Sequence, residues 1–359
     1  MSRDVVFVSY TGQVSGAEKV MLSVIGEALR AGSRVTLACP PGPLTGQLPE
    51  GCAHVVIPEL SLGGQRGVAR IAAAARLVVR WALAAATLRP IVRPAGTSTV
   101  VNSVFALPAL RLARPPRGVA WLVHDAMTTG AQRMVIIASR GVVRIAVACT
   151  EAAAAPIRGL GLNLQTVPYG VRWPVPRLTG TRHEPPVVGM LSLLTPWKGH
   201  RVMLAALAEL PGVTAEFAGG NFPGDAGYVE ELTERASRPD LAGRVRFLGH
   251  VDPEVAMMGW DVLVSASVSP EAGPLAVLEA MSHGLPVVAT DHGGPCDFLR
   301  DDVGVLVPPD DPSALAAAIA SVLADDVRRQ RMSEDGRCRI AEEHDIAVTL
   351  PSLVRALTD

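Results

Sequence analysis

Short runs of β-branched residues alternate with longer Ala- and Leu-rich stretches along almost the whole chain, and this alternation restricts the fold more than any other feature. Alternation of this kind is typical of a parallel sheet covered by helices. In the first half we expect helices at Ala17–Ala31 and Gly67–Leu88, and strands at Val5–Ser9, Val35–Ala38, Val55–Ile57, Thr99–Asn102, Val119–Val123 and Ile145–Ala148. The first half therefore predicts a doubly wound α/β domain.

A second series of the same kind follows a Pro-rich, polar stretch from Trp173 to Pro186, whose composition predicts an interdomain linker. We expect helices at His200–Leu210 and Pro274–His283, three helices from Pro312 onward, and strands at Val187–Leu191, Thr214–Ala218, Val245–Leu248, Val262–Val264, Val287–Thr290 and Val305–Val307. A length of 359 residues fits two domains. Two doubly wound units in succession predict a ligand cleft between them, at the carboxyl ends of the strands.

The overall composition excludes several classes of protein. A hydrophobic content of 49% and a mean hydropathy of +0.30 indicate a well-packed globular protein. A net charge of −1 and the lack of a recognisable motif argue against a nucleic-acid partner. The five cysteines are scattered and form no C-x-x-C pair, so we expect a reduced protein without a thiolate metal site. We expect no leader peptide and no membrane span, hence a cytoplasmic protein, with a peripheral place at the inner membrane face as the alternative.

The stretch from Ser269 to Met281 carries two carboxylates eight positions apart. Glu271 lies in a Pro/Gly loop that ends at Pro274, a residue favoured at the start of a helix. We expect Glu271 at the mouth of this loop, beside a helix N-terminus whose free N–H groups attract phosphate. Glu279 follows roughly 7 Å along the helix axis, where a carboxylate can accept two ribose hydroxyls. The stretch therefore predicts a site for a sugar, a phosphate and a ribose, as in a nucleotide sugar.

Two further residues are candidates for the same site. Lys198 is one of only two lysines and begins a helix after a Thr-Pro turn, where its charge can bind a diphosphate; the alternative is a surface lysine in a loop. His124 ends an apolar strand and precedes Asp125, which favours a site residue over a structural histidine. Gly12 and Gly16, in a strand-to-helix loop, are a weak signal when taken alone.

Taken together, these motifs resemble the retaining glycosyltransferases of family 4, which have the GT-B architecture of two facing Rossmann-like domains. The similarity is specific in the second half and looser in the first. It rests there on Gly12-x-x-Ser15-Gly16-Ala17-Glu18, His124-Asp125 and Pro168-Tyr169-Gly170-Val171. In the second half it rests on Pro196-Trp197-Lys198-Gly199-His200, Ala218-Gly219-Gly220, Phe247-Leu248-Gly249-His250-Val251, the pair Glu271 and Glu279, the run from Gly284 to Gly294, and Gly304-x-Leu306-Val307-Pro308-Pro309.

The resemblance implies a division of the chain and a role for each site residue. Residues 1–172 would bind the acceptor, residues 173–340 would bind the donor, and a helix in residues 341–359 would pack back on the first domain. Lys198, Glu271 and His124 would be catalytic: Lys198 would stabilise the leaving nucleotide, Glu271 would hold the transferred sugar, and His124 would lie near the reacting sugar. Donor binding would fall to Gly16, Gly219, Gly220, Gly273, Leu275, Ala276 and Glu279.

The activity that the resemblance implies is a metal-independent, retaining transfer of the hexosyl type, without a cofactor. The partners would be a nucleotide-diphosphate sugar and an acceptor hydroxyl on a glycan, a lipid-linked sugar or a small molecule. Leu193 departs from the pattern, because the family usually has an arginine there as a second contact to the diphosphate. Arg201 could replace that arginine. The alternative function is a non-catalytic GT-B-like protein that binds a nucleotide sugar or supports a partner enzyme.

The arginine-dotted helix expected between Gly67 and Arg89 has two interpretations. Arg76 and Arg80 share a face, so the helix could rest on an anionic membrane. An ordinary amphipathic helix that covers the sheet is favoured, because its apolar residues are largely alanine and would bury little area in lipid.

Overall fold

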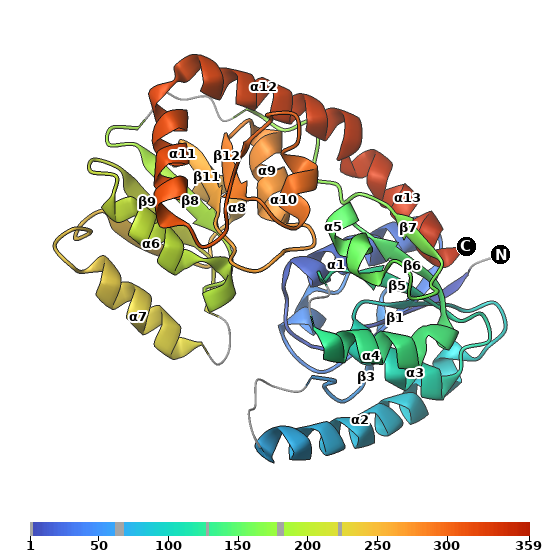
Figure 1. The fold of residues 1–359 in the computed structure, drawn as a ribbon. Coiled ribbons are helices and arrows are strands. Elements are labelled where there is room, and N and C mark those ends of the chain that lie inside the picture. The colour runs from blue at the N-terminus through green and yellow to red at the C-terminus, as the bar shows by residue number, and fades with distance from the viewer. Residues whose placement is uncertain (1–2, 62–67, 127–128, 178–182, 222–224) are drawn as a thin grey trace. The chain divides into compact units, whose positions relative to one another are not determined.

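The structure, a computed structural model, describes residues 3–61, 68–126, 129–177, 183–221 and 225–359. The chain divides into two units (Figure 1). The N-terminal unit comprises Met1–Tyr169 together with Val348–Asp359, and the C-terminal unit comprises Gly170–Ala347.

The N-terminal unit is built on a seven-stranded parallel sheet with the order β3-β2-β1-β4-β5-β6-β7. The order reverses between β1 and β4, which pair directly, as Val5 with Ser98 through Val8 with Val101. The strands are β1 (Asp4–Val8), β2 (Arg34–Cys39), β3 (Ala53–Val56), β4 (Ser98–Val101), β5 (Val119–Val123), β6 (Val143–Ala148) and β7 (Leu164–Thr166). Ligands of doubly wound sheets bind where the strand order reverses, so the loops after β1 and β4 mark this unit's binding edge.

The N-terminal unit also contains helices, the last of which extends two residues into the C-terminal unit. They are α1 (Gly16–Arg30), α2 (Val68–Val92), α3 (Leu107–Ala113), α4 (Gly130–Ser139), α5 (Glu151–Ala154) and α13 (Ile346–Thr358). Helix α2 packs beside α3 and buries Leu77 and Leu88. The indole N–H of Trp81 on α2 donates a hydrogen bond to the Phe105 carbonyl at 2.8 Å. No helix within the described ranges is long and apolar enough to cross a bilayer.

The C-terminal unit has a six-stranded parallel sheet with the order β10-β9-β8-β11-β12-β13. The order reverses between β8 and β11. The strands are β8 (Val187–Leu191), β9 (Thr214–Ala218), β10 (Val245–Gly249), β11 (Val262–Ser265), β12 (Val287–Thr290) and β13 (Val305–Val307). The helices are α6 (His200–Ala208), α7 (Ala226–Ala236), α8 (Pro253–Met257), α9 (Leu275–His283), α10 (Gly294–Phe298), α11 (Pro312–Ala324) and α12 (Asp326–Glu343).

The core of the C-terminal unit lies between its sheet and the helices α6 and α11. Phe217 of β9, Met203 of α6 and Ile319 of α11 are fully or almost fully buried within one apolar cluster. Parallel strands that are covered on both faces read as continuous apolar runs, which is why this half was recognisable from the sequence.

The expected parallel α/β architecture is confirmed, and its strands agree with the structure to within about two residues. Five of the expected strand ranges are matched without change, namely Val119–Val123, Val187–Leu191, Thr214–Ala218, Val287–Thr290 and Val305–Val307. Strand β7 was missed, because Leu164–Thr166 is short, polar and largely exposed. The three expected helices of the tail are present as α11, α12 and α13.

Some helix boundaries differ from the expectation. Helix α9 begins at Leu275, and Pro274 is its extended N-cap rather than its first helical residue. Helix α6 ends at Ala208, before Leu210. Helix α2 continues to Val92, past Pro90, while the expected start at Gly67 lies outside the described residues.

The described part of the expected linker is attached to the C-terminal unit. The Arg337 guanidinium lies over the Trp173 ring at 4.6 Å and donates to the Val175 carbonyl at 3.1 Å. The Pro176 carbonyl is 3.1 Å from Nδ1 of His283. Residues 178–182, which also belong to the expected linker, lie outside the described residues.

The end of α13 belongs to the N-terminal unit and is fixed there by hydrogen bonds to its carbonyl groups. Ser98 donates to the Thr358 carbonyl at 2.8 Å, Arg144 donates to the Leu357 carbonyl at 3.0 Å, and Arg117 donates to the Asp359 carbonyl at 3.2 Å. These side chains supply donors to carbonyls that have no partner within the helix.

Gly199 allows the loop after β8 to approach the end of β11. Its φ is +80°, and a Cβ atom at this position would lie 1.8 Å from the Ala266 carbonyl oxygen. Because both a left-handed backbone and a close approach are needed, only glycine fits this position. Lys198 directly precedes Gly199, so this close approach also fixes the position of the Lys198 backbone.

We predict that Gly199→Ala destabilises the C-terminal unit by roughly 3 kcal/mol or more, since the turn must shift as well as tolerate an unfavourable φ. Gly212→Ala is the matched control, because Gly212 has a φ of +83° but no atom within 4 Å of a new Cβ. Its cost should be only about 1 kcal/mol. Chemical denaturation of the two variants measures both values, and equal losses would show that the approach to Ala266 contributes nothing.

Candidate functional site

The candidate site of the C-terminal unit is formed by loops that leave the carboxyl ends of neighbouring strands. The loop after β8 carries Lys198, and the loop after β11 carries Glu271. Because β8 and β11 are the strands between which the order reverses, their following loops diverge and leave room for a ligand.

Lys198 and Glu271 form an ion pair between these two loops. The Lys198 ammonium donates to one carboxylate oxygen of Glu271, and the Ser267 hydroxyl donates to the other. The side chains are only 16% and 10% exposed, so the pair is largely removed from water. The ammonium also lies 4.3 Å from the centre of the Trp197 ring. A partly buried ion pair of this kind holds two opposite charges ready for a ligand that carries both a diphosphate and hydroxyl groups.

The loop that carries Glu271 is braced by the loop after β12. Gly293 has a φ of +71°, and a Cβ there would lie 2.4 Å from the Glu271 carbonyl oxygen. The Gly294 N–H donates to that same carbonyl at 2.7 Å. The His292 ring is 2.6 Å from the Ser267 carbonyl through Nε2. These contacts fix the backbone on both sides of Glu271, so the position of its carboxylate is set by the fold.

Gly219 and Gly220 join the loop after β9 to the loop after β8. A Cβ on Gly219 would lie 1.8 Å from the Ser192 carbonyl oxygen, and the Leu194 N–H donates to the Gly220 carbonyl at 3.0 Å. Neither glycine has a Cβ atom, so the backbone here takes up little space at the binding edge, beside the segment that leads to Lys198.

The start of helix α9 holds the remaining sequence-predicted residues of this unit. Gly273, Leu275 and Ala276 are half-buried. The N–H groups of Leu275 and Ala276 have no acceptor within the helix because they belong to its first turn. Glu279 is half-buried one turn further along the same helix. The sequence-predicted order of loop carboxylate, helix N-terminus and helix carboxylate is therefore present.

His200 also lies in this region, although the sequence alone indicated no role for it. Its side chain is fully buried at the start of α6, with Nε2 3.3 Å from the Ser192 hydroxyl and its ring edge against Phe217. Burial and the nearby charge of Lys198 lower the pKa of His200 to about 4. A neutral imidazole packs beneath the loop of Lys198 and adds no charge to the site.

A second polar cluster lies in the N-terminal unit, where its strand order reverses. Gly16 is the first residue of α1, and the carboxylate of Glu18 accepts from the N–H of Ser15 at 3.1 Å and from its hydroxyl at 2.6 Å. Asn102, which follows β4, donates through Nδ2 to Glu18 at 3.2 Å. The loops after β1 and β4 are therefore linked by a buried hydrogen bond. In the sequence, Glu18 was recognised only as part of a motif, and no pattern indicated a role for Asn102.

His124 extends this cluster and is held through both ring nitrogens. Its Nε2 faces Oδ1 of Asn102, and its Nδ1 faces the hydroxyl of Tyr169. Because Nδ2 of Asn102 donates to the Glu18 carboxylate, Oδ1 is an acceptor, and His124 must carry its proton on Nε2. Nδ1 then accepts from Tyr169. The chain from Glu18 to Tyr169 therefore selects one tautomer of His124.

Burial sets the protonation of this cluster. It lowers the pKa of His124 to about 3, so the imidazole is neutral around pH 7. Burial also raises the pKa values of Glu18 and Tyr10.

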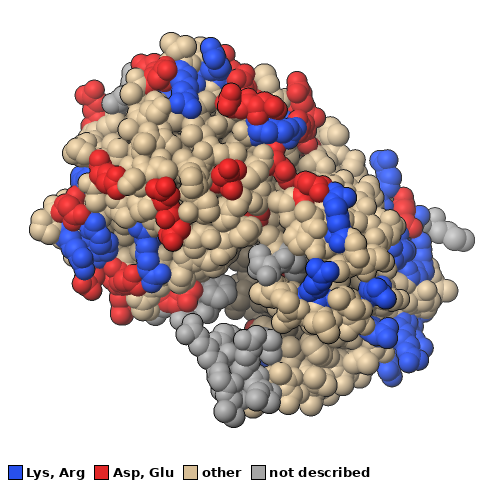
Figure 2. Space-filling model, in the orientation of Figure 1, with Lys and Arg blue, Asp and Glu red and all other residues tan. Residues whose placement is uncertain are grey.

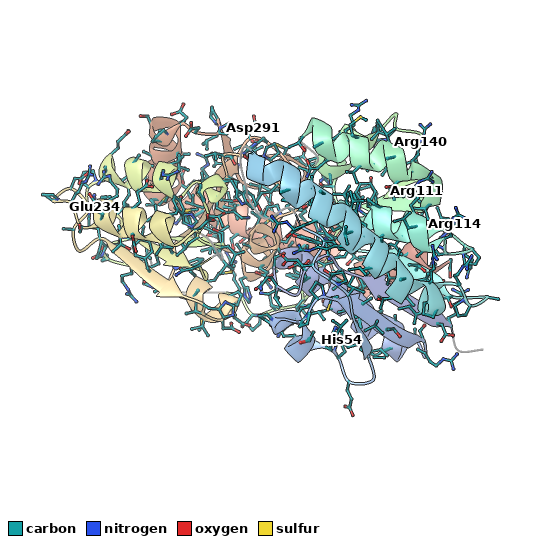
Figure 3. All side chains as sticks on the ribbon, turned by 90° about the horizontal axis from the view of Figure 1, so that it is seen from below. His54, Arg111, Arg114, Arg140, Glu234 and Asp291 are labelled. Atoms are coloured by element: carbon teal, nitrogen blue, oxygen red, sulfur yellow. The ribbon has the colours of Figure 1, made fainter. Side chains whose placement is uncertain are left out.

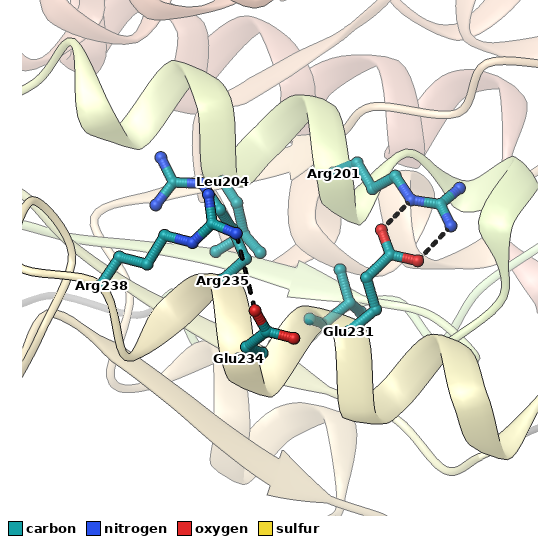
Figure 4. Close-up of a pocket in the computed structure, with 7 residues that line it drawn as sticks. Arg201, Leu204, Glu231, Glu234, Arg235 and Arg238 are labelled. Atoms are coloured by element: carbon teal, nitrogen blue, oxygen red, sulfur yellow. Dashed lines mark hydrogen bonds and ion pairs between the residues drawn. The ribbon is translucent and has the colours of Figure 1, made fainter.

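Arg201, the suggested replacement for the arginine expected at position 193, is paired with a carboxylate. Arg201 and Glu231 form a two-bonded ion pair at 2.5 Å between α6 and α7. This pair lines a surface pocket of about 270 Å³ together with Arg235, Arg238 and Glu234 (Figure 4). The guanidinium of Arg201 is bonded to Glu231 in this structure, and Leu193 is half-buried in the loop after β8.

The adjacent aspartates at 301–302 and 310–311 lie in turns or at a helix cap. Asp311 caps α11 by accepting from the Ala314 N–H, and Asp301 pairs with Arg339 at 2.9 Å. Asp301, Asp302 and Asp310 have positive φ values, as expected for turns. No group of three or more His, Cys, Asp or Glu side chains in the described ranges is arranged to hold a metal ion.

Relatives of known activity match parts of the chain. It is 39% identical over 142 residues to a phosphatidyl-myo-inositol mannosyltransferase of Mycolicibacterium smegmatis, which covers 37% of this chain and 35% of the relative. It is 34% identical over 160 residues to a lipopolysaccharide core biosynthesis glycosyltransferase of Rhizobium meliloti, which covers 44% of this chain and 45% of the relative. The matches therefore span less than half the length of these relatives.

Solved structures match the chain over nearly its full length. HepE of Anabaena in complex with UDP-glucose superposes with a TM-score of 0.81 at 21% identity and covers 99% of both chains. Sucrose-phosphate synthase of Thermosynechococcus elongatus gives a TM-score of 0.81 at 19% identity and covers 98% of both. The chain has the GT-B fold of these proteins. Residues 172–339, almost the whole C-terminal unit, match the family described as Glycosyl transferases group 1.

Proposed function

We propose that this protein is a retaining glycosyltransferase, which moves a hexose from a nucleotide-diphosphate sugar to an acceptor hydroxyl in the cytoplasm. The ion pair between Lys198 and Glu271 carries the proposal, since it places a cation and a carboxylate together where the strand order of the donor unit reverses. The names of the relatives support a transferase, and the UDP-glucose complex of HepE makes UDP-sugars the first donors to test.

The residues around the ion pair suit the parts of such a donor. Lys198 exchanges its bond to Glu271 for one to the diphosphate, while the N–H groups of Leu275 and Ala276 bind phosphate at the start of α9. Glu271, released by Lys198, accepts from sugar hydroxyls, and Glu279 accepts from the ribose. Gly219, Gly220 and Gly273 let the donor approach the backbone closely. In the N-terminal unit, the loop at Gly16, at the start of α1, would approach a phosphate or the acceptor.

The reaction breaks the bond between the anomeric carbon and the diphosphate oxygen and forms a bond from the same face to the acceptor oxygen. The acceptor proton passes to a donor phosphate oxygen. Lys198 stabilises the negative charge of the departing nucleotide, and Glu271 stabilises the positive charge that develops at the anomeric carbon. His124 is neutral and both of its ring nitrogens are bonded within the N-terminal unit, so it does not exchange a proton.

Leu193 supports a second candidate function, a protein of this fold that binds a nucleotide sugar without transferring it. A leucine cannot make the bidentate phosphate contact of an arginine, and Arg201 is paired with Glu231. The transferase is the stronger proposal, because the named relatives that match the chain are transferases.

We predict that Lys198→Ala lowers kcat/KM for sugar transfer by about 100-fold or more, because the charge on the departing diphosphate loses its main counter-charge. The measurement uses the full chain, a panel of UDP-, GDP- and dTDP-sugars and detection of released nucleotide. Lys19→Ala is the matched control. Lys19 is the only other lysine and is exposed on α1, so this variant should keep the wild-type rate.

A different pattern would favour the second candidate. If the wild-type chain binds a nucleotide sugar but releases no nucleotide, and Leu193→Arg alone restores turnover, the natural protein is a binder. If Lys198→Ala and Lys19→Ala behave alike in an active enzyme, Lys198 has no role in catalysis.

The hydrogen bonds of His124 give an independent test of the N-terminal unit. We predict that nitrogen NMR of histidine-labelled protein shows His124 with its proton on Nε2, the signal being assigned by its loss in His124→Gln. In Glu18→Gln the new amide must keep its oxygen toward the Ser15 N–H, so its NH₂ group faces Asn102. Asn102 then turns over, and the proton of His124 should move to Nδ1.

The matched control is Glu151→Gln, an exposed carboxylate of the same unit that pairs with Arg158. This variant should leave the His124 signal unchanged. A wild-type protein that carries the proton on Nδ1 would contradict the assigned chain from Glu18 to Tyr169.

A further inference from the structure

Ser267 is a second side chain bonded to Glu271, beside the ion pair. It lies two residues after β11 and four residues before Glu271, and it is only 3% exposed. Its hydroxyl donates to one carboxylate oxygen of Glu271, while the Lys198 ammonium donates to the other. The Ser267 hydroxyl is uncharged, so a diphosphate that attracts Lys198 leaves the bond between Ser267 and Glu271 in place.

The main chain at Ser267 is held from the loop after β12. The Ser267 carbonyl accepts from the hydroxyl of Thr290 at 2.9 Å and lies 2.6 Å from Nε2 of His292. Thr290 is the last residue of β12, and Figure 3 labels Asp291, the first residue of the loop that follows. Both contacts go to the carbonyl, so a substitution that removes only the Ser267 hydroxyl keeps them.

The two chain neighbours of Ser267 are held from the loop after β8. A Cβ on Gly199 would lie 1.8 Å from the Ala266 carbonyl oxygen, and the Val268 N–H donates to the Trp197 carbonyl at 2.9 Å. Ser267 therefore lies where the loops after β8, β11 and β12 meet. Because its backbone is fixed from both sides, its hydroxyl has a set position relative to Glu271.

Glu271 depends on such a partner because it is largely removed from water. Figure 2 shows acidic side chains on the surface of the C-terminal unit, at the upper left, where water solvates them. The Glu271 side chain is only 10% exposed, and a buried carboxylate without hydrogen bonds is costly. When Lys198 turns to the diphosphate, Ser267 keeps one carboxylate oxygen hydrogen-bonded and leaves the other to accept from a sugar hydroxyl.

We propose that Ser267 is a positioning residue for the sugar of the donor, because it holds the Glu271 carboxylate in place while Lys198 moves to the diphosphate. This inference rests on the proposed function. Ser267 acts through Glu271, so its contribution requires both the Glu271 carboxylate and a sugar in the ligand. Removing its hydroxyl therefore weakens a nucleotide sugar and leaves the bare nucleotide unaffected.

Calorimetric titration of the full chain with UDP and with UDP-glucose tests this proposal without requiring turnover. We expect Ser267→Ala to bind UDP-glucose about ten-fold more weakly than the wild type, the effect of one hydrogen bond to a charged group, and to bind UDP equally well. The double variant Ser267→Ala, Glu271→Ala should bind UDP-glucose as Glu271→Ala alone does, since Ser267 has no carboxylate left to hold.

Ser282→Ala is the matched control. Ser282 is a serine of the same unit with the same exposure of 3%, and its hydroxyl donates to the backbone carbonyl of Glu279 at 2.7 Å. This variant should bind both ligands as the wild type does, because it loses one buried hydrogen bond away from Glu271.

Three results would overturn the proposal. The first is equal affinity of the wild type and Ser267→Ala for UDP-glucose. The second is a loss in Ser267→Ala that extends to UDP, and the third is a loss that adds to the loss in Glu271→Ala. The proposed transfer fails separately, if the wild type binds UDP-glucose but forms no UDP from it, while the affinities still measure the role of Ser267.

Discussion

The ion pair between Lys198 and Glu271 is the interaction on which the account of the donor unit depends. Two opposite charges that are mostly removed from water cost desolvation energy, and this cost is offset only while each charge has a partner. The fold supplies the required geometry through close backbone approaches at Gly199 and Gly293, which need glycine. Without a ligand, Lys198 and Glu271 therefore neutralise each other. A ligand with a diphosphate and hydroxyl groups can replace this pairing, because the diphosphate binds the ammonium and the hydroxyl groups donate to the carboxylate.

Both units place a polar bridge at the same point of their topology. In the C-terminal unit Lys198 and Glu271 link the loops after β8 and β11, and in the N-terminal unit Glu18 and Asn102 link the loops after β1 and β4. Each bridge spans the strands between which the order reverses. The consequences differ, because the first bridge joins two charges that a ligand can separate, whereas the second is buried and fixes the tautomer of His124.

The sequence was sufficient for the parts of the molecule that follow from local pattern. Buried parallel strands such as Val187–Leu191 read as apolar runs, and the order of Glu271, Leu275 and Glu279 follows from one loop and one helix. It was not sufficient where residues distant along the chain meet. Asn102 shows its role only beside Glu18 and His124, and the short polar strand β7 pairs only because β6 offers it an edge. The exposure of Val78 and Leu83 also depended on which face of α2 packs inward.

A crystal structure of the full chain with UDP-glucose tests the central claim most directly. The account predicts that Lys198 leaves Glu271 and contacts the diphosphate, while the Glu271 carboxylate accepts from hydroxyls of the sugar and the N–H groups of Leu275 and Ala276 face a phosphate. An intact ion pair between Lys198 and Glu271, with the nucleotide sugar bound elsewhere on the chain, would contradict it.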